Sequence, residues 1–517
     1  MLISDPKMFI SLTRTFNLEK MKRKIVIIGS GLGGLSCGVL LAKEGYDVTI
    51  LEQSSQPGGC LQCFKRKGIK FETGMHFIGS ADKGQTLFRL MKALEIDDKI
   101  QLSRLNEDGY DVISLCGKKY KFANGHERFV EQLTKDFPDQ KTNLERYWKL
   151  IEDVARSSSL HSLDFNAAQG ALGMEYQMRA MDDVLNSVIT NPSLVNVLAG
   201  NLPLYAAEKG KTPFSTHAFI MDFYNNSAYR VVGGSDNIAK ALVDVINKYG
   251  GRVILNKKVS RICCNNEIAT GVECCDDSIY DADIVISSIH PMRTVEMLRG
   301  NGLIRPAYRK RIESMHQTVG GFAVYLHFKE NTVPYLNYNY YAYNQDSPWN
   351  CEFYSPETWP KGYLYMHFCH MQSPVYAQAG VVLSYMKMED VERWIGTRIG
   401  HRGEDYEVFK RKHAEKLIKA LEREYPNIKN NIEAYYTSTP LTYLDYTGTE
   451  GGSMYGIAKD VSNSTGGRVS HKTKIPNLYL AGQNINSHGM LGTIVGTIVT
   501  CGEIIPQEKL YQNLSIN

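Results

Sequence analysis

A glycine-rich segment near the start of the chain has the spacing of a phosphate-binding turn. Three glycines match the pattern GxGxxG within the run Gly29, Ser30, Gly31, Leu32, Gly33 and Gly34. The first glycine of this pattern permits a tight turn, the second lets backbone approach a pyrophosphate, and the third lets a helix pack on a strand. Because N–H groups at a helix start attract anions, the segment predicts a dinucleotide-binding site.

An acidic residue follows at the distance that such a site requires. Glu52 stands 18 residues after Gly34, where a carboxylate binds a ribose hydroxyl and disfavours a 2′-phosphate. We assign the neighbouring Gln53 to the same site. These residues alone fit either FAD or NAD.

The elements around these residues match a βαβ unit. The apolar runs 24–28 and 47–51 predict buried parallel strands, and residues 35–43 predict the helix between them. The whole unit takes about 30 residues, the size of one crossover. Elements of the same type recur later, as a helix at 237–249, strands at 252–255, 259–263 and 282–288, a last strand at 474–480 and a last helix at 489–505.

Other material separates these elements. Residues 81–227 are mainly helical in pattern, with helices expected at 129–137, 143–155 and 174–189. Residues 315–390 are rich in β-forming side chains, and 408–425 predict an amphipathic helix. A chain of 517 residues is also too long for one compact core, so we expect two domains interleaved in sequence.

Three further segments carry a resemblance to a known family. They are QPGG at Gln56–Gly59, FETGMHFIG at Phe71–Gly79 and NLYLAGQN at Asn477–Asn484. With the glycine-rich turn they resemble the phytoene desaturase-like branch of the FAD amine oxidase superfamily, and within it the retinol saturase and carotenoid isomerase relatives. The resemblance runs roughly from residue 22 to 505.

The resemblance implies the cofactor, the fold class and the reaction. The cofactor would be FAD, bound by an α/β, Rossmann-like domain of the ββα type built from residues 22–80, 228–298 and 456–507. Residues 81–227 and 299–455 would form an interleaved α+β substrate domain, and 1–21 an extension. The protein would act on C=C bonds of a lipophilic polyene or isoprenoid, as a saturase or desaturase, and we favour reduction.

The resemblance also assigns the remaining cofactor contacts. Gly58 and Gly59 would lie along the phosphate and ribityl part of FAD, and Gly482 and Asn484 would hold that part as well. The backbone of Val259 would meet the adenine. The last helix, near Leu491, Gly492 and Thr493, would point its N–H groups at the flavin ring. The chain departs from many relatives at Asn484, where they have an acid, and at Cys60, where they have arginine.

Two histidines are candidates for proton transfer. His76 and His488 could each protonate a carbon intermediate or polarise the substrate, and each could instead be a structural histidine. Cys60 and Cys63 could be redox-active, although buried, inert thiols fit them better. The 11 cysteines form no paired CxxC ligand sets, so we expect no metal site.

Rival functions remain open at this point. A flavin-dependent cis–trans isomerase would need reduced flavin but no stoichiometric electron donor. A prenyl-binding carrier of the same fold would bind no flavin, and an amine oxidase fits the local motifs less well. Since no second GxGxxG follows a strand, the electron partner would be a diffusing NAD(P)H, a quinone or oxygen.

Composition limits partners and location. The net charge of +4 is spread evenly, which predicts no nucleic-acid partner. Residues 1–20 lack a continuous apolar core, and the apolar stretches 25–42 and 475–502 are broken by glycine or polar residues, so neither a signal peptide nor a membrane span is expected. We expect a cytoplasmic protein that can contact a membrane peripherally.

Overall fold

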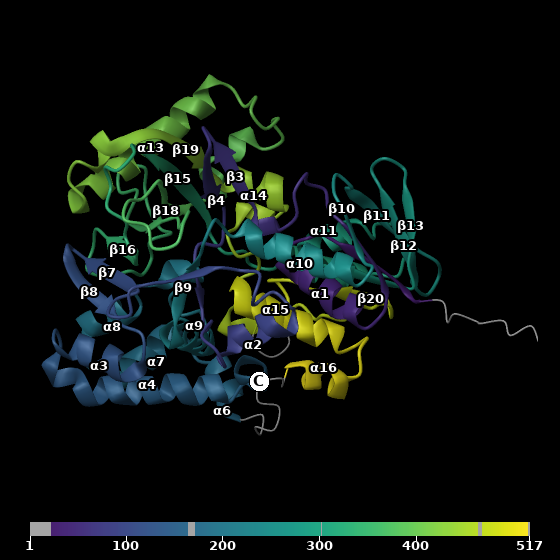
Figure 1. The fold of residues 1–517 in the computed structure, drawn as a ribbon, viewed down its shortest axis with the longest axis horizontal. Helices are drawn as coiled ribbons and strands as arrows, with labels where there is room; N and C mark the ends of the chain where they lie inside the picture. The colour runs from purple at the N-terminus through teal and green to yellow at the C-terminus, as the bar shows by residue number, and fades with distance from the viewer. Residues whose placement is uncertain (1–21, 164–170, 301, 464–467, 515–517) are drawn as a thin grey trace, which may run out of the picture.

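The fold has two halves, each built around its own β-sheet (Figure 1). The computed structural model describes residues 22–163, 171–300, 302–463 and 468–514. The first half contains α1, β20 and β10–β13, and the second contains α3, α4, α13 and the largest sheet.

A five-stranded parallel sheet forms the centre of the first half. Its strand order is β10-β2-β1-β14-β20. The strands are β1 (Lys24–Ile28), β2 (Asp47–Leu51), β10 (Arg252–Ile254), β14 (Ile284–Ser287) and β20 (Leu478–Leu480). These strands come from three distant parts of the chain, and every pairing is parallel.

Layers cover both faces of this sheet, which is why its strands are continuously apolar. Ile25 and Ile27 of β1 point towards α1 (Leu32–Lys43), α10 (Asp236–Lys248) and α15 (Gly489–Cys501). Val26 and Ile28 point the other way. There they pack on the antiparallel sheet of β11 (Val259–Cys264), β12 (Ala269–Cys274) and β13 (Ile279–Asp281).

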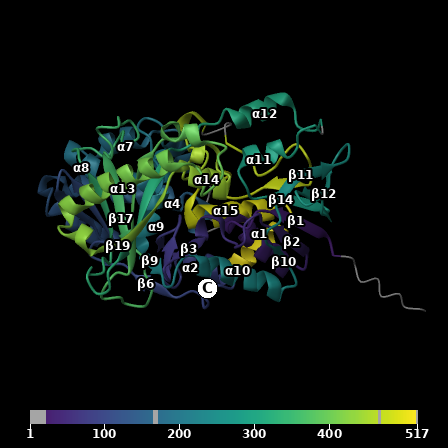
Figure 2. The same cartoon turned by 90° about the horizontal axis from the view of Figure 1, so that it is seen from above.

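A seven-stranded sheet forms the second half. Its order is β19-β15-β18-β17-β16-β7-β8, antiparallel except where β16 meets β7. The strands are β7 (Asp111–Leu115), β8 (Lys118–Phe122), β15 (Gly320–Phe328), β16 (Asn339–Tyr343), β17 (Gly362–His367), β18 (Ala379–Met386) and β19 (Ile432–Ser438). One face packs on a helical layer that includes α4 (Lys141–Arg156) and α9 (Phe214–Asn226). The other face packs on α13 (Glu404–Glu424), which crosses the sheet in Figure 2.

The remaining elements are short. The helices are α2 (Thr86–Ala93), α3 (His126–Thr134), α5 (Ser159–Ser162), α6 (Ala171–Gln177), α7 (Met181–Val188), α8 (Pro192–Leu198), α11 (Pro291–Glu296), α12 (Pro306–Glu313), α14 (Pro440–Thr447) and α16 (Gln507–Leu514). The strands are β3 (Cys63–Arg66), β4 (Ile69–Glu72), β5 (Ile78–Gly79), β6 (Leu102–Arg104) and β9 (Ala228–Val231).

One expectation about the elements needs correction. The single helix expected at 174–189 is divided into α6 and α7, because Ala180 adopts an extended backbone and forms a β-bridge with Pro213. The region 81–227 is mainly helical, as expected, and it also contributes the β7–β8 hairpin to the large sheet. The proposed domain boundaries stay a prediction, although the shared parallel sheet supports an interleaved arrangement.

Candidate active site

One cavity of about 860 Å³ lies between the two halves. Its lining combines the turns at the carboxyl ends of β1 and β2 with one face of the seven-stranded sheet. Ligands of open α/β sheets bind beyond the carboxyl ends of the strands, so the position is the one expected for a cofactor. The cavity has two parts, a polar cleft along the glycine-rich turn and an apolar slot over the large sheet.

Each glycine of the turn has a different structural task. Gly29 has a φ of +90°, which favours glycine, and its N–H donates to the Leu51 carbonyl at 2.8 Å. A Cβ on Gly34 would overlap the Gly29 carbonyl oxygen, and one on Gly33 would lie 2.7 Å from Gly482 Cα. By contrast, a Cβ on Gly31 would meet no protein atom within 4 Å, because this residue faces the cleft.

Glu52 lies buried at the end of β2, with 7% of its surface exposed. Its Oε2 accepts hydrogen bonds from the Ser30 N–H at 2.9 Å and the Ser30 hydroxyl at 2.6 Å, and its Oε1 accepts from the Ser54 N–H at 2.8 Å. These donors hold the carboxylate at the wall of the cleft. Ser30 does not line the cavity itself, so in this structure it positions Glu52.

Most of the other residues assigned to the cofactor line the same cleft. The cleft lining includes Gly29, Gly31, Leu32, Gly33, Glu52, Gln53, Gly58, Gly59, Val259, Gly482, Asn484 and Thr493. Besides Ser30, three assigned residues do not line it, namely Gly34, Leu491 and Gly492. The Leu491 side chain packs into the hydrophobic core, and Gly492 fits against Ser487, whose Cβ would lie 2.5 Å from a Cβ there. The helix starts at Gly489, as expected, and Gly489, Met490 and Thr493 face the cavity.

Asn484 has a fixed orientation at the far end of the cleft. Its Oδ1 accepts from the Ile457 N–H at 2.8 Å, and its carbonyl accepts from Lys459 Nζ at 3.3 Å. Burial lowers the pKa of Lys459 to about 7, since its charged form loses solvation. Asn484 is therefore held by the Ile457 backbone on one side and by Lys459 on the other, and no sequence motif pointed to Lys459.

Of the two histidine candidates, His76 lines the cavity. Its Nδ1 lies 3.5 Å from Glu72 Oε2. Glu72 is itself buried and accepts from the Ser235 N–H at 3.1 Å. The Arg230 guanidinium donates to the His76 carbonyl at 3.4 Å. The separation from Glu72 is not a hydrogen bond, because His76 Nδ1 is buried without a hydrogen-bond partner among the described residues.

The second histidine candidate occupies a different place. His488 precedes α15 and lies outside the lining of the main cavity, with its ring 4.7 Å from that of Tyr455. Burial, with a smaller contribution from Lys459, lowers its pKa to about 3, so the ring is neutral near pH 7. A neutral, buried ring outside the cavity is a weak acid catalyst.

The two nearby cysteines are thiols rather than thiolates. Burial raises the pKa of Cys60, which lines the cavity. Burial and the charge of Glu72 raise the pKa of Cys63 to about 12. Since the thiolate is the reactive form, both are poor nucleophiles.

The apolar slot was not located by sequence reasoning. Alternate residues of β15, β17 and β18 point from the sheet into it, namely Ala323, Tyr325, Leu364, Met366, Val381 and Leu383. Leu204, Tyr224, Tyr443, Met454 and Tyr455 complete the wall. The period-two pattern of these strands shows which residues share a face, but only the sheet pairing shows which face meets the cofactor cleft.

The cleft fits a dinucleotide. Gly31 leaves space for a pyrophosphate, the Glu52 carboxylate can accept from ribose hydroxyls, and the start of α15 provides N–H groups at the other end. Fold and site together define an FAD-dependent oxidoreductase. The chain belongs to the flavin containing amine oxidoreductase family, whose model matches residues 32–500.

Similar proteins include enzymes of polyene metabolism. The chain is 27% identical to all-trans-retinol 13,14-reductase of Danio rerio, covering 94% of this chain and 86% of the relative. It is 23% identical to prolycopene isomerase 1 of an Oncidium hybrid cultivar, covering 89% and 79%. It is 21% identical to phytoene desaturase (lycopene-forming) of a Paracoccus strain, covering 93% and 96%. These relatives agree with the branch expected from the sequence motifs.

A solved structure shares the fold. An oxidoreductase from Methanosarcina mazei superposes with a TM-score of 0.62 at 18% identity, covering 92% of this chain and 99% of its own. The expected combination of a Rossmann-like FAD domain and a substrate domain is thereby confirmed.

Proposed function

We propose that the protein reduces a C=C bond of a lipophilic polyene, with FAD as the hydride carrier. The observation that carries the proposal is the continuity of the apolar slot with the cofactor cleft in one cavity. The names of its relatives, a retinol reductase, a prolycopene isomerase and a phytoene desaturase, support the same substrate class.

The slot suits an extended apolar molecule better than a small charged one. Its walls are mainly aliphatic and aromatic side chains of the large sheet. Apolar burial contributes about 25 cal/mol per Å², so a long hydrocarbon chain can bind with few polar contacts. Apolar walls offer water few hydrogen-bond partners, and a dry site protects a hydride transfer from side reactions.

FAD, when bound, supplies the hydride, and the chain must supply a proton and an ordered substrate. We assign the proton to His76, because its ring lines the cavity and Glu72 lies behind it. Glu72 acts as a positioning residue, since it contacts His76 and Ser235 rather than the slot. General acid catalysis of this type contributes about 10²–10⁴-fold.

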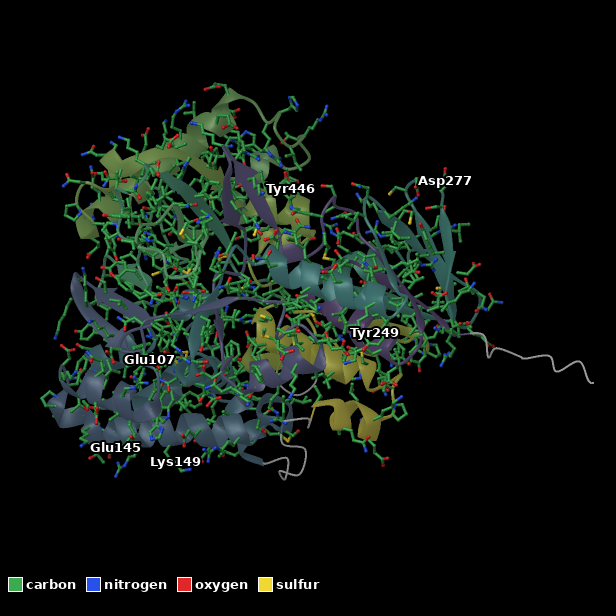
Figure 3. All side chains as sticks on the ribbon, in the orientation of Figure 1. Glu107, Glu145, Lys149, Tyr249, Asp277 and Tyr446 are labelled. Atoms are coloured by element: carbon green, nitrogen blue, oxygen red, sulfur yellow. The ribbon has the colours of Figure 1, made fainter. Side chains whose placement is uncertain are left out.

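We infer that the protein works in the cytoplasm at a membrane surface, with a diffusing NAD(P)H, a quinone or oxygen as electron partner. Among the described residues, no helix is long and apolar enough to span a bilayer. Tyr446, at the end of α14, lines the cavity and is 52% exposed (Figure 3). Asp445, the neighbour of Tyr446 in sequence, forms an ion pair with Arg402. Arg402 follows a loop that exposes Ile395 and Ile399.

This loop combines apolar with basic side chains, the composition that favours contact with anionic lipid. Ile395 is 51% and Ile399 47% exposed, and Arg393 and Arg398 lie beside them. Replacement of Ile395 and Ile399 by serine should reduce co-sedimentation with anionic vesicles. Unchanged sedimentation would remove the loop from the proposal.

The proposed reaction is tested with reduced and oxidised holoprotein and a panel of polyenes. Reduced protein should add two hydrogens to a polyene and become oxidised in equal amount. Loss of two hydrogens with oxidised protein would identify a desaturase instead. Reoxidation by an imine and by no polyene would contradict the proposal.

A flavin-dependent cis–trans isomerase is the second candidate. The similarity to prolycopene isomerase 1 over 89% of the chain favours it. The same panel separates the two functions, because an isomerase would change the retention time of the product without changing its mass or consuming electrons.

A further inference from the structure

The cofactor cleft needs a positive charge that the glycine-rich turn does not supply. The turn offers backbone N–H groups to a pyrophosphate, and the side chain held against it, that of Glu52, is acidic. Charge-assisted bonds from arginine or lysine are the strong contacts of phosphate groups in proteins. A cation elsewhere in the lining of the cleft would therefore stabilise the bound cofactor.

Lysine and arginine side chains line the described part of the cavity at three positions, Lys257, Lys258 and Arg293. Lys257 already forms an ion pair with Asp276. Lys258 is exposed and precedes Val259, the residue that we predict to meet the adenine. Arg293 is the cation that is left for the phosphate part of the cleft.

The segment that carries Arg293 begins beside the glycine-rich turn. Ser288, directly after β14, donates through its hydroxyl to the Gly29 carbonyl at 2.9 Å. A Cβ on Gly29 would lie 2.8 Å from Ile289 Cγ2, so this segment and the turn are in contact. The short helix α11 follows and places the Arg293 side chain in the lining of the cavity.

Only weak contacts hold the Arg293 guanidinium in its present place. Its Nη1 lies 3.0 Å from Glu296 Oε2, and its Nη2 lies 3.3 Å from Glu450 Oε2 in the second half. Its Nε donates to the Gly448 carbonyl at 3.5 Å. The three charged side chains are 35%, 31% and 33% exposed. Since ion pairs with this exposure contribute little to stability, the guanidinium can turn to a stronger anion.

We propose that Arg293 binds the pyrophosphate of FAD and forms the cationic side of the cofactor site. A guanidinium has five N–H donors in a planar fork, so it can bind two phosphate oxygens in parallel and keep its contact with the Gly448 carbonyl. The cofactor is then joined through one side chain to the loop that follows α14. This role is independent of the reaction proposed above, because it concerns the cofactor alone.

ADP and adenosine are matched probes of this contact, because they differ only in the phosphates. Each is titrated into the full-length apoprotein, and binding is measured by calorimetry. The wild type should bind ADP more tightly than adenosine. Arg293→Met should lower this preference about 10- to 150-fold, the effect of losing a hydrogen bond to a charged group. Its affinity for adenosine should stay within about 2-fold of the wild type.

Two other cations provide controls. Arg309, on α12, donates to the Val295 carbonyl at 3.2 Å and does not line the cavity. Arg309→Met removes a positive charge outside the cleft and should keep the preference for ADP within about 2-fold. Lys258→Met removes the exposed cation at the adenine end and should have a smaller effect than Arg293→Met. Arg293→Lys keeps the charge without the fork, so its preference should lie between those of the wild type and Arg293→Met.

The holoprotein gives a second readout that does not require a stable apoprotein. The potassium bromide concentration that releases half of the FAD should fall in Arg293→Met and stay unchanged in Arg309→Met. Equal values in both variants would overturn the proposal, as would an unchanged preference for ADP in Arg293→Met. A larger loss in Lys258→Met than in Arg293→Met would also overturn it, since Lys258 would then serve the phosphates. No polyene enters these measurements, so their results do not depend on the proposed function.

Discussion

Substitution of Gly31 separates cofactor binding from folding. A Cβ at this position would meet no protein atom within 4 Å, and the backbone φ of −62° suits any residue. Gly31→Ala and Gly31→Val should therefore leave the unfolding free energy of the apoprotein within about 0.5 kcal/mol of the wild type. The added methyl groups project into the cleft, where they push a pyrophosphate away from the backbone N–H groups.

The expected loss of affinity follows from those hydrogen bonds. Each hydrogen bond to a charged group contributes about 1.5–3 kcal/mol, so loss of one weakens FAD binding roughly 10- to 150-fold. Valine should have the larger effect because it fills more of the cleft. The assay is titration of apoprotein with FAD, followed by flavin fluorescence quenching, beside urea unfolding of the same samples.

A second glycine provides the matched comparison. A Cβ on Gly34 would overlap the Gly29 carbonyl oxygen, so Gly34→Ala should destabilise the apoprotein itself. Wild-type FAD affinity in Gly31→Val would refute the assignment of the cleft. A Gly31→Ala protein as unstable as Gly34→Ala would refute the geometry of the turn.

Three further predictions concern charged groups. Glu52→Ala should weaken FAD binding about 10-fold or more in the same titration, because the ribose loses a charged acceptor. His76→Gln should retain FAD but lower polyene turnover about 10²–10⁴-fold, and undiminished turnover would exclude His76 as the acid. Burial raises the pKa of Asp111 to about 7, so the folded protein holds this proton more tightly than the unfolded chain does. The proton therefore stabilises the folded state at low pH, and this stabilisation is lost as the pH rises from about 4 to 7. Between pH 5 and 7.5 the wild type should therefore lose about 3 kcal/mol more unfolding free energy than Asp111→Asn, and parallel urea-unfolding curves would contradict this.

Local patterns were sufficient to predict the nucleotide-binding half. The strand expected at 24–28 is β1, and the glycine-rich turn, α1 and β2 follow where the sequence placed them. The local sequence pattern and the tertiary fold agree in this half. Its strands are buried on both faces and are therefore continuously apolar, and its turn requires glycine.

Elements that depend on distant partners could not be predicted. The break between α6 and α7 follows from the β-bridge of Ala180 with Pro213, 33 residues away in sequence. The β7–β8 hairpin carried a local signal in the alternation of KKYKF, which the helical character of its surroundings concealed.

The same limit applies to the site. Glu52 and the glycines follow from a motif, whereas the orientation of His76 depends on Glu72 and on Arg230 from β9. The walls of the slot depend on the pairings of β18 with β15 and β17. Sequence spacing does not specify these pairings.

The most direct measurement of the central claim is a single turnover in D₂O. Holoprotein reduced with dithionite under nitrogen is mixed with one equivalent of a polyene alcohol, and the product is analysed by mass spectrometry while flavin absorbance is recorded. The proposed reaction predicts that flavin absorbance returns and that the product gains two deuterium atoms, one delivered as hydride and one as a proton. A flavin that stays reduced, with a polyene of unchanged mass, would contradict it.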